Sequence, residues 1–412
     1  MTDTVNGPRN TELWARADAV IPRGGIFFTR SARFAGKDVF PGFIAEAEGC
    51  RVTDVDGRSY IDFNCGNGPN LLGYRHPEVE AAARAQAEKT DLAAFFNEAM
   101  VLYAERLIRW SETMHWAVPV KNGSDATNLA MRTMRSARQK PLIILFTSAY
   151  HGFGPEIALQ PEFDPASATR NVRRLPWNDA AALNDAIASL GGDVAGIMLN
   201  PLDQNPVQIT RAASPEFIEA IENFRAATGA LVAVDDVRNG FRLHARGSHR
   251  HMGIEPDLLC LGKALGNGHA VSALLGKDAV RGGVEAVQLT ATYMFSAVAH
   301  RAGIAMLDVY ERDDVLTHLQ AMGQRLVDGL TEAGRACGHE DVVLSGPATM
   351  PMFLFSRDEK ARRARTFARE AALRGAIFHP TLNWFLCYAH KQADVDEAIA
   401  IGAEAFRHTP TA

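Results

Sequence analysis

Cysteine is scarce in this chain of 412 residues. There are five cysteines, and no two of them are spaced as a CxxC pair. An odd number of scattered cysteines argues against a disulfide framework and against a thiolate metal site. We therefore expect all five to be small buried side chains, in a protein of the reducing cytoplasm.

A large excess of charge and long apolar runs are missing as well. The formal net charge is −5, which is too mild for a protein that binds nucleic acid through a basic face. No run of 18 or more apolar residues occurs, so we expect no membrane-spanning helix. The first residues do not read as a secretory signal, and no HExxH zinc motif is present, so we expect no metal.

What the chain does have is an alternation of two patterns in its middle part. Short apolar runs typical of buried strands alternate with amphipathic stretches typical of helices, at 126–138, 179–190 and 215–228. The apolar runs lie at 141–147, 194–200, 230–236, 258–262 and 272–276. This alternation predicts an α/β fold with a mostly parallel sheet covered by helices on both faces.

The ends of the chain differ from the middle. A helix is predicted up to Pro22, and residues 43–63 read as strand, turn and strand, with Asp56-Gly57 as the hairpin signal. A long helical stretch follows residue 300, and the pattern after it indicates a smaller α+β domain. We expect a large domain at 66–300 and a small domain at 301–412. An N-terminal segment at 1–65 is expected to contribute to the small domain and to the active site.

One of the apolar runs is followed by a lysine and another ends in two aspartates, and both residue types are common in catalytic sites. Lys263 follows the run at 258–262, and a buried strand-end lysine is costly unless its charge is removed, as in a Schiff base with an aldehyde cofactor. Asp235 and Asp236 end another run, where an acid can hold a proton on the ring nitrogen of pyridoxal phosphate, PLP. The alternatives are a lysine that reaches solvent and an acid that caps a turn.

Two further segments stand where a phosphate and a ring would bind. Asn122, Gly123 and Ser124 open an amphipathic helix, whose N–H groups and dipole favour an anion, although a plain helix cap is the alternative. Tyr150 could stack on a flat ring, and the neighbouring His151 could donate or accept a hydrogen bond. The order of phosphate loop, aromatic residue, acid and lysine carries more weight than any one of them.

With these motifs the whole chain resembles the class III (subgroup II) aminotransferases of fold type I. Within that family it is most similar to the branch of glutamate-1-semialdehyde aminomutases and β-amino-acid aminotransferases. The resemblance implies a large domain with a mostly parallel seven-stranded sheet, a smaller α+β domain, and PLP bound as a Schiff base to Lys263. It also implies a homodimer with shared active sites, in which Thr292 reaches the phosphate from the second subunit.

The resemblance assigns roles to the other residues too. Asp235 matches the acid at the pyridine nitrogen, Val237 the apolar residue beneath the ring, and Tyr150 the stacking aromatic. The phosphate loop falls on Asn122, Gly123 and Ser124. The usual Asp-Glu pair of the family reads Asp235-Asp236 here, and the shorter Asp236 could alter contacts around the cofactor.

The substrate contacts are the least defined part of the site. Arg30 lies eight residues after Pro22, where this branch has an arginine that binds a carboxylate, and Phe28 would form an apolar wall beside it. Asn383 lies where the small domain of the family approaches the site. A surface role for Arg30 and core packing for Asn383 are the alternatives.

These residues predict an aminotransferase that moves an amino group between a β- or α-amino acid and a keto acid. An aminomutase like the glutamate-1-semialdehyde enzyme, or a racemase of the same fold, would share nearly all the cofactor residues. A cofactor-binding regulator or structural protein built on this fold is disfavoured, because Lys263 is present and no additional DNA-binding domain is evident.

Overall fold

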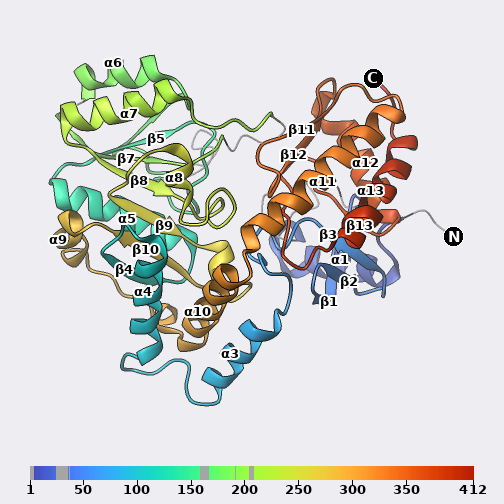
Figure 1. The fold of residues 1–412 in the computed structure, drawn as a ribbon, viewed down its shortest axis with the longest axis horizontal. Coiled ribbons are helices and arrows are strands. Elements are labelled where there is room, and N and C mark those ends of the chain that lie inside the picture. Colours follow the sequence, from blue (N-terminus) through green and yellow to red (C-terminus); the bar gives the residue numbers. More distant parts are fainter. Residues whose placement is uncertain (1–3, 25–35, 37, 158–166, 191, 204–207) are drawn as a thin grey trace. The chain divides into compact units, whose positions relative to one another are not determined.

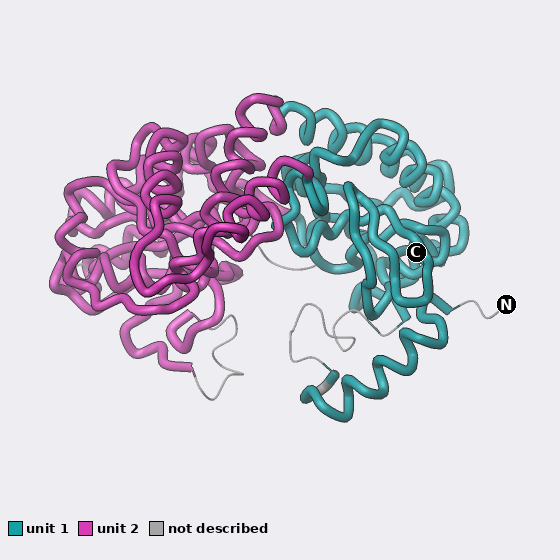
Figure 2. Tube along the Cα trace, turned by 90° about the horizontal axis from the view of Figure 1, so that it is seen from below, with its two compact units in different colours: residues 1–76, 206–209, 317–412 teal, residues 77–205, 210–316 magenta. Residues whose placement is uncertain are grey.

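The computed structural model describes residues 4–24, 36, 38–157, 167–190, 192–203 and 208–412. The chain divides into two compact units, shown in different colours in Figure 2. Unit 1 holds Met1–His76, Pro206–Ile209 and Thr317–Ala412, and unit 2 holds Pro77–Asn205 and Thr210–Leu316. Residues from the two ends of the chain thus fold together in unit 1.

Unit 2 is built on a seven-stranded sheet with the order β4-β10-β9-β8-β7-β5-β6. Its strands are β4 (Trp116–Val120), β5 (Leu142–Phe146), β6 (Val172–Leu175), β7 (Val194–Leu199), β8 (Leu231–Asp235), β9 (Leu258–Leu261) and β10 (Ser272–Gly276). Strand β10 runs antiparallel to both of its neighbours, and the pairs from β9 to β6 are parallel. The predicted α/β class and mostly parallel sheet are confirmed.

The helices of unit 2 alternate with these strands along the chain (Figure 1). They are α3 (Pro77–Ala87), α4 (Glu98–Ser111), α5 (Gly123–Arg138), α6 (Ala180–Leu190), α7 (Pro215–Thr228), α8 (Ser248–Met252), α9 (Arg281–Glu285) and α10 (Ala297–Arg312). Short 3-10 turns lie at η3 (Lys263–Gly266), η4 (Asp278–Val280) and η5 (Thr292–Phe295). Helices α6 and α7 pack on each other, and α10 packs on α3 and α4.

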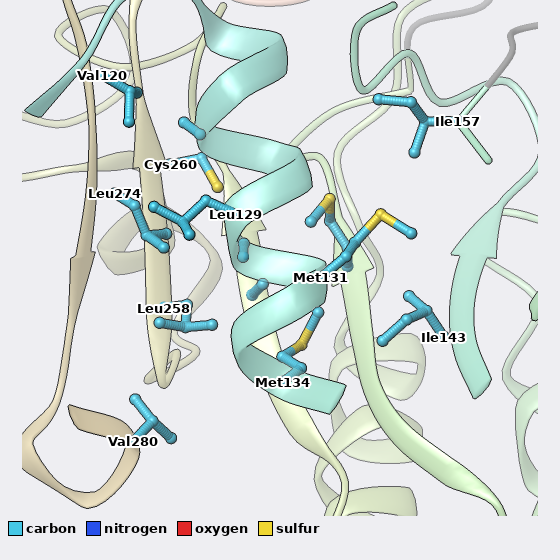
Figure 3. Close-up of a cluster of buried hydrophobic side chains, with 14 of the residues drawn as sticks. Val120, Leu129, Met131, Met134, Ile143, Ile157, Leu258, Cys260, Leu274 and Val280 are labelled. Atoms are coloured by element: carbon cyan, nitrogen blue, oxygen red, sulfur yellow. The ribbon is translucent and has the colours of Figure 1, made fainter. Parts of the chain in front are cut away.

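Helix α5 packs across one face of the sheet, because its apolar side chains recur every three or four residues. Leu129 and Met134 lie among Leu258, Cys260 and Leu274 of the strands, as Figure 3 shows. Each such side chain contributes roughly 1.5–3 kcal/mol when it leaves water. This packing fixes the first turn of α5 relative to the ends of the strands.

Unit 1 joins the N-terminal strands to the C-terminal part of the chain. Its main sheet has the order β1-β2-β3-β13, with β1 (Ile44–Glu48), β2 (Arg51–Asp54), β3 (Ser59–Asp62) and β13 (Ala376–Ile377). The expected Asp56-Gly57 turn joins β2 to β3, and Gly57 has the φ of 84° that glycine adopts readily. A second pair of strands is β11 (Val342–Ser345) with β12 (Met352–Phe355).

The helices of unit 1 are α1 (Pro8–Val20), η1 (Pro22–Gly24), η6 (Glu359–Ala361), α12 (Arg362–Leu373), α13 (Gln392–Arg407) and most of α11 (Val315–Ala336). Helix α1 ends before Pro22, as predicted. The long helical stretch expected after residue 300 is two helices, α10 and α11. Asp314 takes a left-handed φ of 45° between them, which interrupts the helix. None of the described helices is both long and apolar enough to cross a membrane.

All five cysteines are free thiols. Four are buried as expected, but Cys337 is only partly buried, so that prediction was wrong for one residue. In unit 1, sulfur atoms of Cys65 and Cys387 and a ring nitrogen of His390 lie within 4.8 Å of one another. His390 Nδ1 is 3.2 Å from Cys387 Sγ and already accepts the Cys387 amide N–H at 3.0 Å. We read this group as a hydrogen-bonded cluster.

Candidate active site

The predicted cofactor residues of unit 2 gather at one edge of its sheet. Parallel strands β4, β5, β8 and β9 end at this edge, and each is followed by residues singled out in the sequence. Val237 and Gly262 show how close the strand ends come: a Cβ on Gly262 would lie 3.1 Å from Val237 Cγ1 and 3.6 Å from the Cα of Gly123. The residues after three strands therefore meet at one point.

The segment after β4 forms the first turn of helix α5. Asn122 caps the helix, and its backbone N–H donates to Asp125 Oδ2 at 2.8 Å. Gly123 sits where a Cβ would come within 2.5 Å of Val237 Cγ1, so a larger residue would force a shift. Ser124 Oγ accepts the amide N–H of Phe153 at 2.9 Å. This turn has the N–H groups and dipole direction that bind a phosphate.

The segments after β5 and β8 are joined by a buried hydrogen bond. His151 Nδ1 lies 2.8 Å from Asp235 Oδ2, and the amide N–H of Val237 donates to Asp235 Oδ1 at 3.1 Å. Asp235 therefore has a hydrogen-bonding partner on each carboxylate oxygen. Tyr150 is about half-exposed; burial, and then the charge of Asp235, raises its pKa.

Lys263 follows β9 and opens the short turn η3 with a φ of 37°. Burial lowers the pKa of its ammonium from 10.5 to about 8; the charge of Asp235 opposes this shift, and the guanidinium groups of Arg238 and Arg242 add to it. An amine with such a pKa is partly neutral near pH 8 and can act as a nucleophile or base.

Two groups near Asp235 were not foreseen from the sequence. Asn200, after β7, donates its side-chain N–H to the Asp235 carbonyl at 3.4 Å. Arg238 lies close enough for the negative charge of Asp235 to act on it, although burial lowers its pKa to about 10. An arginine just after a strand reads as a solvent-exposed loop residue, so the sequence held no signal for this role.

The remaining predicted residues are Thr292, Asn383, Arg30 and Phe28. Thr292 is exposed in η5, beside Tyr293, whose ring carries the Lys121 ammonium at 4.6 Å from its centroid. Asn383 belongs to unit 1, where its side-chain N–H donates to the Trp384 carbonyl at 3.0 Å. Arg30 and Phe28 lie outside the described residues. Their roles stay predictions.

The residues at the sheet edge fit PLP. Gly123 and Gly262 keep the space around Val237 open, and a Cβ at either would narrow it. The helix start suits the phosphate, the doubly hydrogen-bonded Asp235 suits a protonated ring nitrogen, and Lys263 suits an aldehyde carbon. Buried His151 Nε2, which lacks a hydrogen-bond partner among the described residues, adds a polar atom behind the acid.

Comparison with known proteins agrees with this chemistry. The family model described as aminotransferase class-III matches residues 34–381. An aminopentol aminotransferase of Sphingopyxis macrogoltabida is 38% identical over 97% of this chain and 94% of that protein. A glutamate-1-semialdehyde 2,1-aminomutase of Syntrophobacter fumaroxidans is 31% identical over 97% of both.

Solved structures extend the comparison to the fold. The PLP form of the FumI protein of Sphingopyxis sp. MTA144 is 36% identical, with a TM-score of 0.93 over 97% of this chain and 96% of that one. A β-phenylalanine aminotransferase of Variovorax paradoxus shares the fold at 21% identity, with a TM-score of 0.83 over 96% and 93% of the two chains. The chain therefore belongs to the class-III aminotransferases, PLP-dependent enzymes of fold type I.

Proposed function

We propose that Lys263 and Asp235 are the two catalytic residues of this aminotransferase. The buried contact between His151 and Asp235, at the sheet edge where Lys263 follows β9, is the observation that carries the proposal. When bound, PLP supplies an aldehyde and an electron-withdrawing ring, which lets an amino group pass between an amino acid and a keto acid. The protein supplies the charges and proton carriers around it.

Lys263 is suited to two tasks. Its lowered pKa leaves a fraction of neutral amine near neutral pH, which is the form that attacks a carbonyl carbon. When Lys263 is not bonded to a carbonyl carbon, its amine can take a proton from one carbon and return it to another. Burial favours the neutral amine and the Asp235 carboxylate favours the charged ammonium. Both forms of Lys263 are therefore present near pH 8.

Asp235 is suited to hold a negative charge in a buried place. An N–H on His151 Nδ1 and the backbone N–H of Val237 would each stabilise the carboxylate. A protonated nitrogen in the ring of PLP would then face a fixed negative charge. On the opposite side, Asn122, Gly123 and Ser124 would hold the phosphate at the start of α5.

The proposal extends to the two substrates, the amino donor and the keto-acid acceptor. We propose that Arg30 binds the carboxylate of an amino-acid donor, with Phe28 and Asn383 nearby. Relatives named for aminopentol and for glutamate-1-semialdehyde widen the set of donors to be tried. A panel of α- and β-amino acids and both of these compounds, with pyruvate and 2-oxoglutarate as acceptors, would identify the substrate.

The same panel separates the transferase from the mutase. An aminotransferase loses its aldehyde absorbance with a donor alone and recovers it only when a keto acid is added. An aminomutase converts glutamate-1-semialdehyde without any keto acid. Steady turnover of that compound in the absence of an acceptor would contradict the proposed aminotransferase and favour the aminomutase, a candidate supported by the 31% identity to such an enzyme.

We further propose a homodimer with shared sites, located in the cytoplasm. Unit 2 exposes several large apolar side chains that a second subunit could cover. Among them are Leu92, Phe95, Phe96, Val101, Leu289 and Tyr293. Tyr293 is next to Thr292, so a partner that covers this surface would receive Thr292 as well. The five free cysteines support a reducing compartment.

A further inference from the structure

Asp236 is a buried acid with few partners. Only 1% of its surface is exposed. Its Oδ2 accepts the backbone N–H of Ser248 at 2.8 Å. Among the described residues, its Oδ1 has no hydrogen-bond partner. The neighbouring Asp235, in contrast, has a hydrogen-bonding partner on each oxygen.

The backbone fixes Asp236 in this place. Its amide N–H donates to the Cys260 carbonyl at 2.9 Å, and its own carbonyl accepts from Gly240 at 2.8 Å. A Cβ on Gly240 would lie 3.5 Å from the Asp236 carboxyl carbon, and one on Gly247 would lie 3.7 Å from Oδ2. The carboxyl group therefore lies close to the backbone at Gly240 and Gly247 and is shielded from solvent.

The groups that face Asp236 do not neutralise it. His249 of α8 is buried, and burial lowers its pKa to about 4, so it is neutral at physiological pH. Tyr310 of α10 donates its hydroxyl to the Phe241 carbonyl and feels the charges of both Arg242 and Asp236. The thiol of Cys260 in β9 and the carboxylate of Asp235 in β8 also interact electrostatically with Asp236, and neither carries a positive charge.

An ionised carboxylate in such surroundings is strongly disfavoured, because it loses its hydration and gains one backbone N–H. Several buried polar atoms nearby also lack partners among the described residues, so a neutral acid or a trapped water has hydrogen-bonding groups within reach. They are Ser248 Oγ and the ring nitrogens of His249. Burial raises the pKa of Asp236 to about 7; hydrogen bonding to Ser248 opposes this shift, and the charge of Asp235 adds to it.

We propose that Asp236 is held as a neutral carboxylic acid, so that the Asp235-Asp236 pair carries a single negative charge, on Asp235. Asp236 is then a positioning residue: it keeps the chain after β8 in place through Ser248 without adding a second charge beside Asp235 and Lys263. The idea that this single charge faces the cofactor rests on the proposed role of Asp235. The protonation state of Asp236 is independent of that role and can be measured separately.

The direct test is infrared spectroscopy of the holoenzyme at about pH 6. We expect a C=O stretching band of a protonated carboxyl group that is lost in Asp236→Asn. Asp62 of unit 1 is a second buried acid whose pKa is raised by burial, so it serves as the matched control. The band of Asp236 should persist in Asp62→Asn. This variant keeps Asp236, so it tests the proposal even if Asp236→Asn does not fold. Absence of an acid band in Asp62→Asn would overturn the proposal.

Thermal unfolding gives a second readout. The folded pKa of Asp236 lies above its ordinary value of 3.8, so the stability that Asp236 contributes should fall as the pH rises from about 4 to about 7. This contribution amounts to at most about tenfold in the unfolding equilibrium constant for each pH unit. Asp236→Asn removes it, so the Tm advantage of the variant over wild type should grow between about pH 5 and about pH 7.

Asp257→Asn is the control for thermal unfolding, because Asp257 is a buried acid of the same unit that is paired with Arg225 at 2.9 Å. It should lower Tm without flattening the pH dependence. A constant difference in Tm between Asp236→Asn and wild type across this pH range would show that Asp236 is ionised in both states. That result would overturn the neutral acid while leaving the roles of Asp235 and Lys263 intact.

Discussion

His151 Nδ1 lies 2.8 Å from Asp235 Oδ2, and both side chains are almost completely buried. The two residues come from loops that follow different strands, β5 and β8, and are 84 positions apart in the chain. A hydrogen bond to a charged group contributes roughly 1.5–3 kcal/mol. This contact therefore fixes the position of the acid on which the proposed chemistry depends.

Replacing Lys263 tests the proposed attachment of PLP. Lys263→Ala should lose the visible absorbance of the bound cofactor and nearly all turnover, because no other amine takes its place. In wild-type apoenzyme, the rate of PLP recapture should rise with pH and level off above about 8, since only the neutral amine attacks the aldehyde. A rise that continues to the ordinary lysine pKa of 10.5 would contradict the lowered pKa.

Asp235→Asn tests which of the two adjacent acids faces the cofactor. The amide cannot hold the ring proton of PLP, so kcat should fall at least about a hundredfold while PLP still binds. Measurement of kcat and of PLP content separates these effects. If Asp235→Asn kept a near wild-type rate, the role would pass to Asp236, and the neutral state proposed for that residue would fail with it.

Gly123→Ala tests the packing of the phosphate loop against Val237. The new methyl group would lie 2.5 Å from Val237 Cγ1, and such overpacking costs roughly 1–3 kcal/mol. We expect weaker PLP binding, measured by equilibrium dialysis, and a partial recovery in the double variant Gly123→Ala with Val237→Ala.

The control for Gly123 is Gly282→Ala in helix α9, where nothing lies within 4 Å of the added Cβ. This variant should bind PLP like wild type. Equal losses in the two single variants would indicate that the loop is not sensitive to the Val237 contact.

Hybrid dimers test whether Thr292 acts across subunits. A dimer of one Lys263→Ala chain and one Thr292→Ala chain has one site with both residues intact if Thr292 reaches the partner's cofactor. Its activity should then approach half that of wild type, whereas neither parent alone is fully active. If Thr292 served its own chain, no site of the hybrid would be intact, and activity would not exceed about half that of the Thr292→Ala parent.

Arg30→Ala tests the nature of the donor. A bidentate contact with a carboxylate is worth roughly 1.5–3 kcal/mol, so kcat/KM for amino acids should fall about ten- to a hundredfold. Plain amines should lose little, and Arg30→Lys should recover only part of the loss, because an ammonium cannot form the planar fork. Equal losses for acids and amines would make Arg30 a structural residue.

The sequence by itself determined the α/β class and the identity of the four strand-end segments. Buried parallel strands read as short apolar runs, and the residues that follow them lie at one edge whatever the order of the strands. Asn122, Tyr150, Asp235 and Lys263 could therefore be named together before their positions were known. Composition likewise pointed to free cysteines, although it could not tell that Cys337 is only partly buried.

Only the tertiary structure decided what each of these side chains touches. Successive side chains in an extended segment point to opposite faces, so two adjacent acids after β8 must have different surroundings, yet the sequence does not say which faces which. Packing brings Asp235 to His151 and Asp236 to the Ser248 amide. The charge of a buried acid follows from its neighbours in space, and those neighbours are far away along the chain.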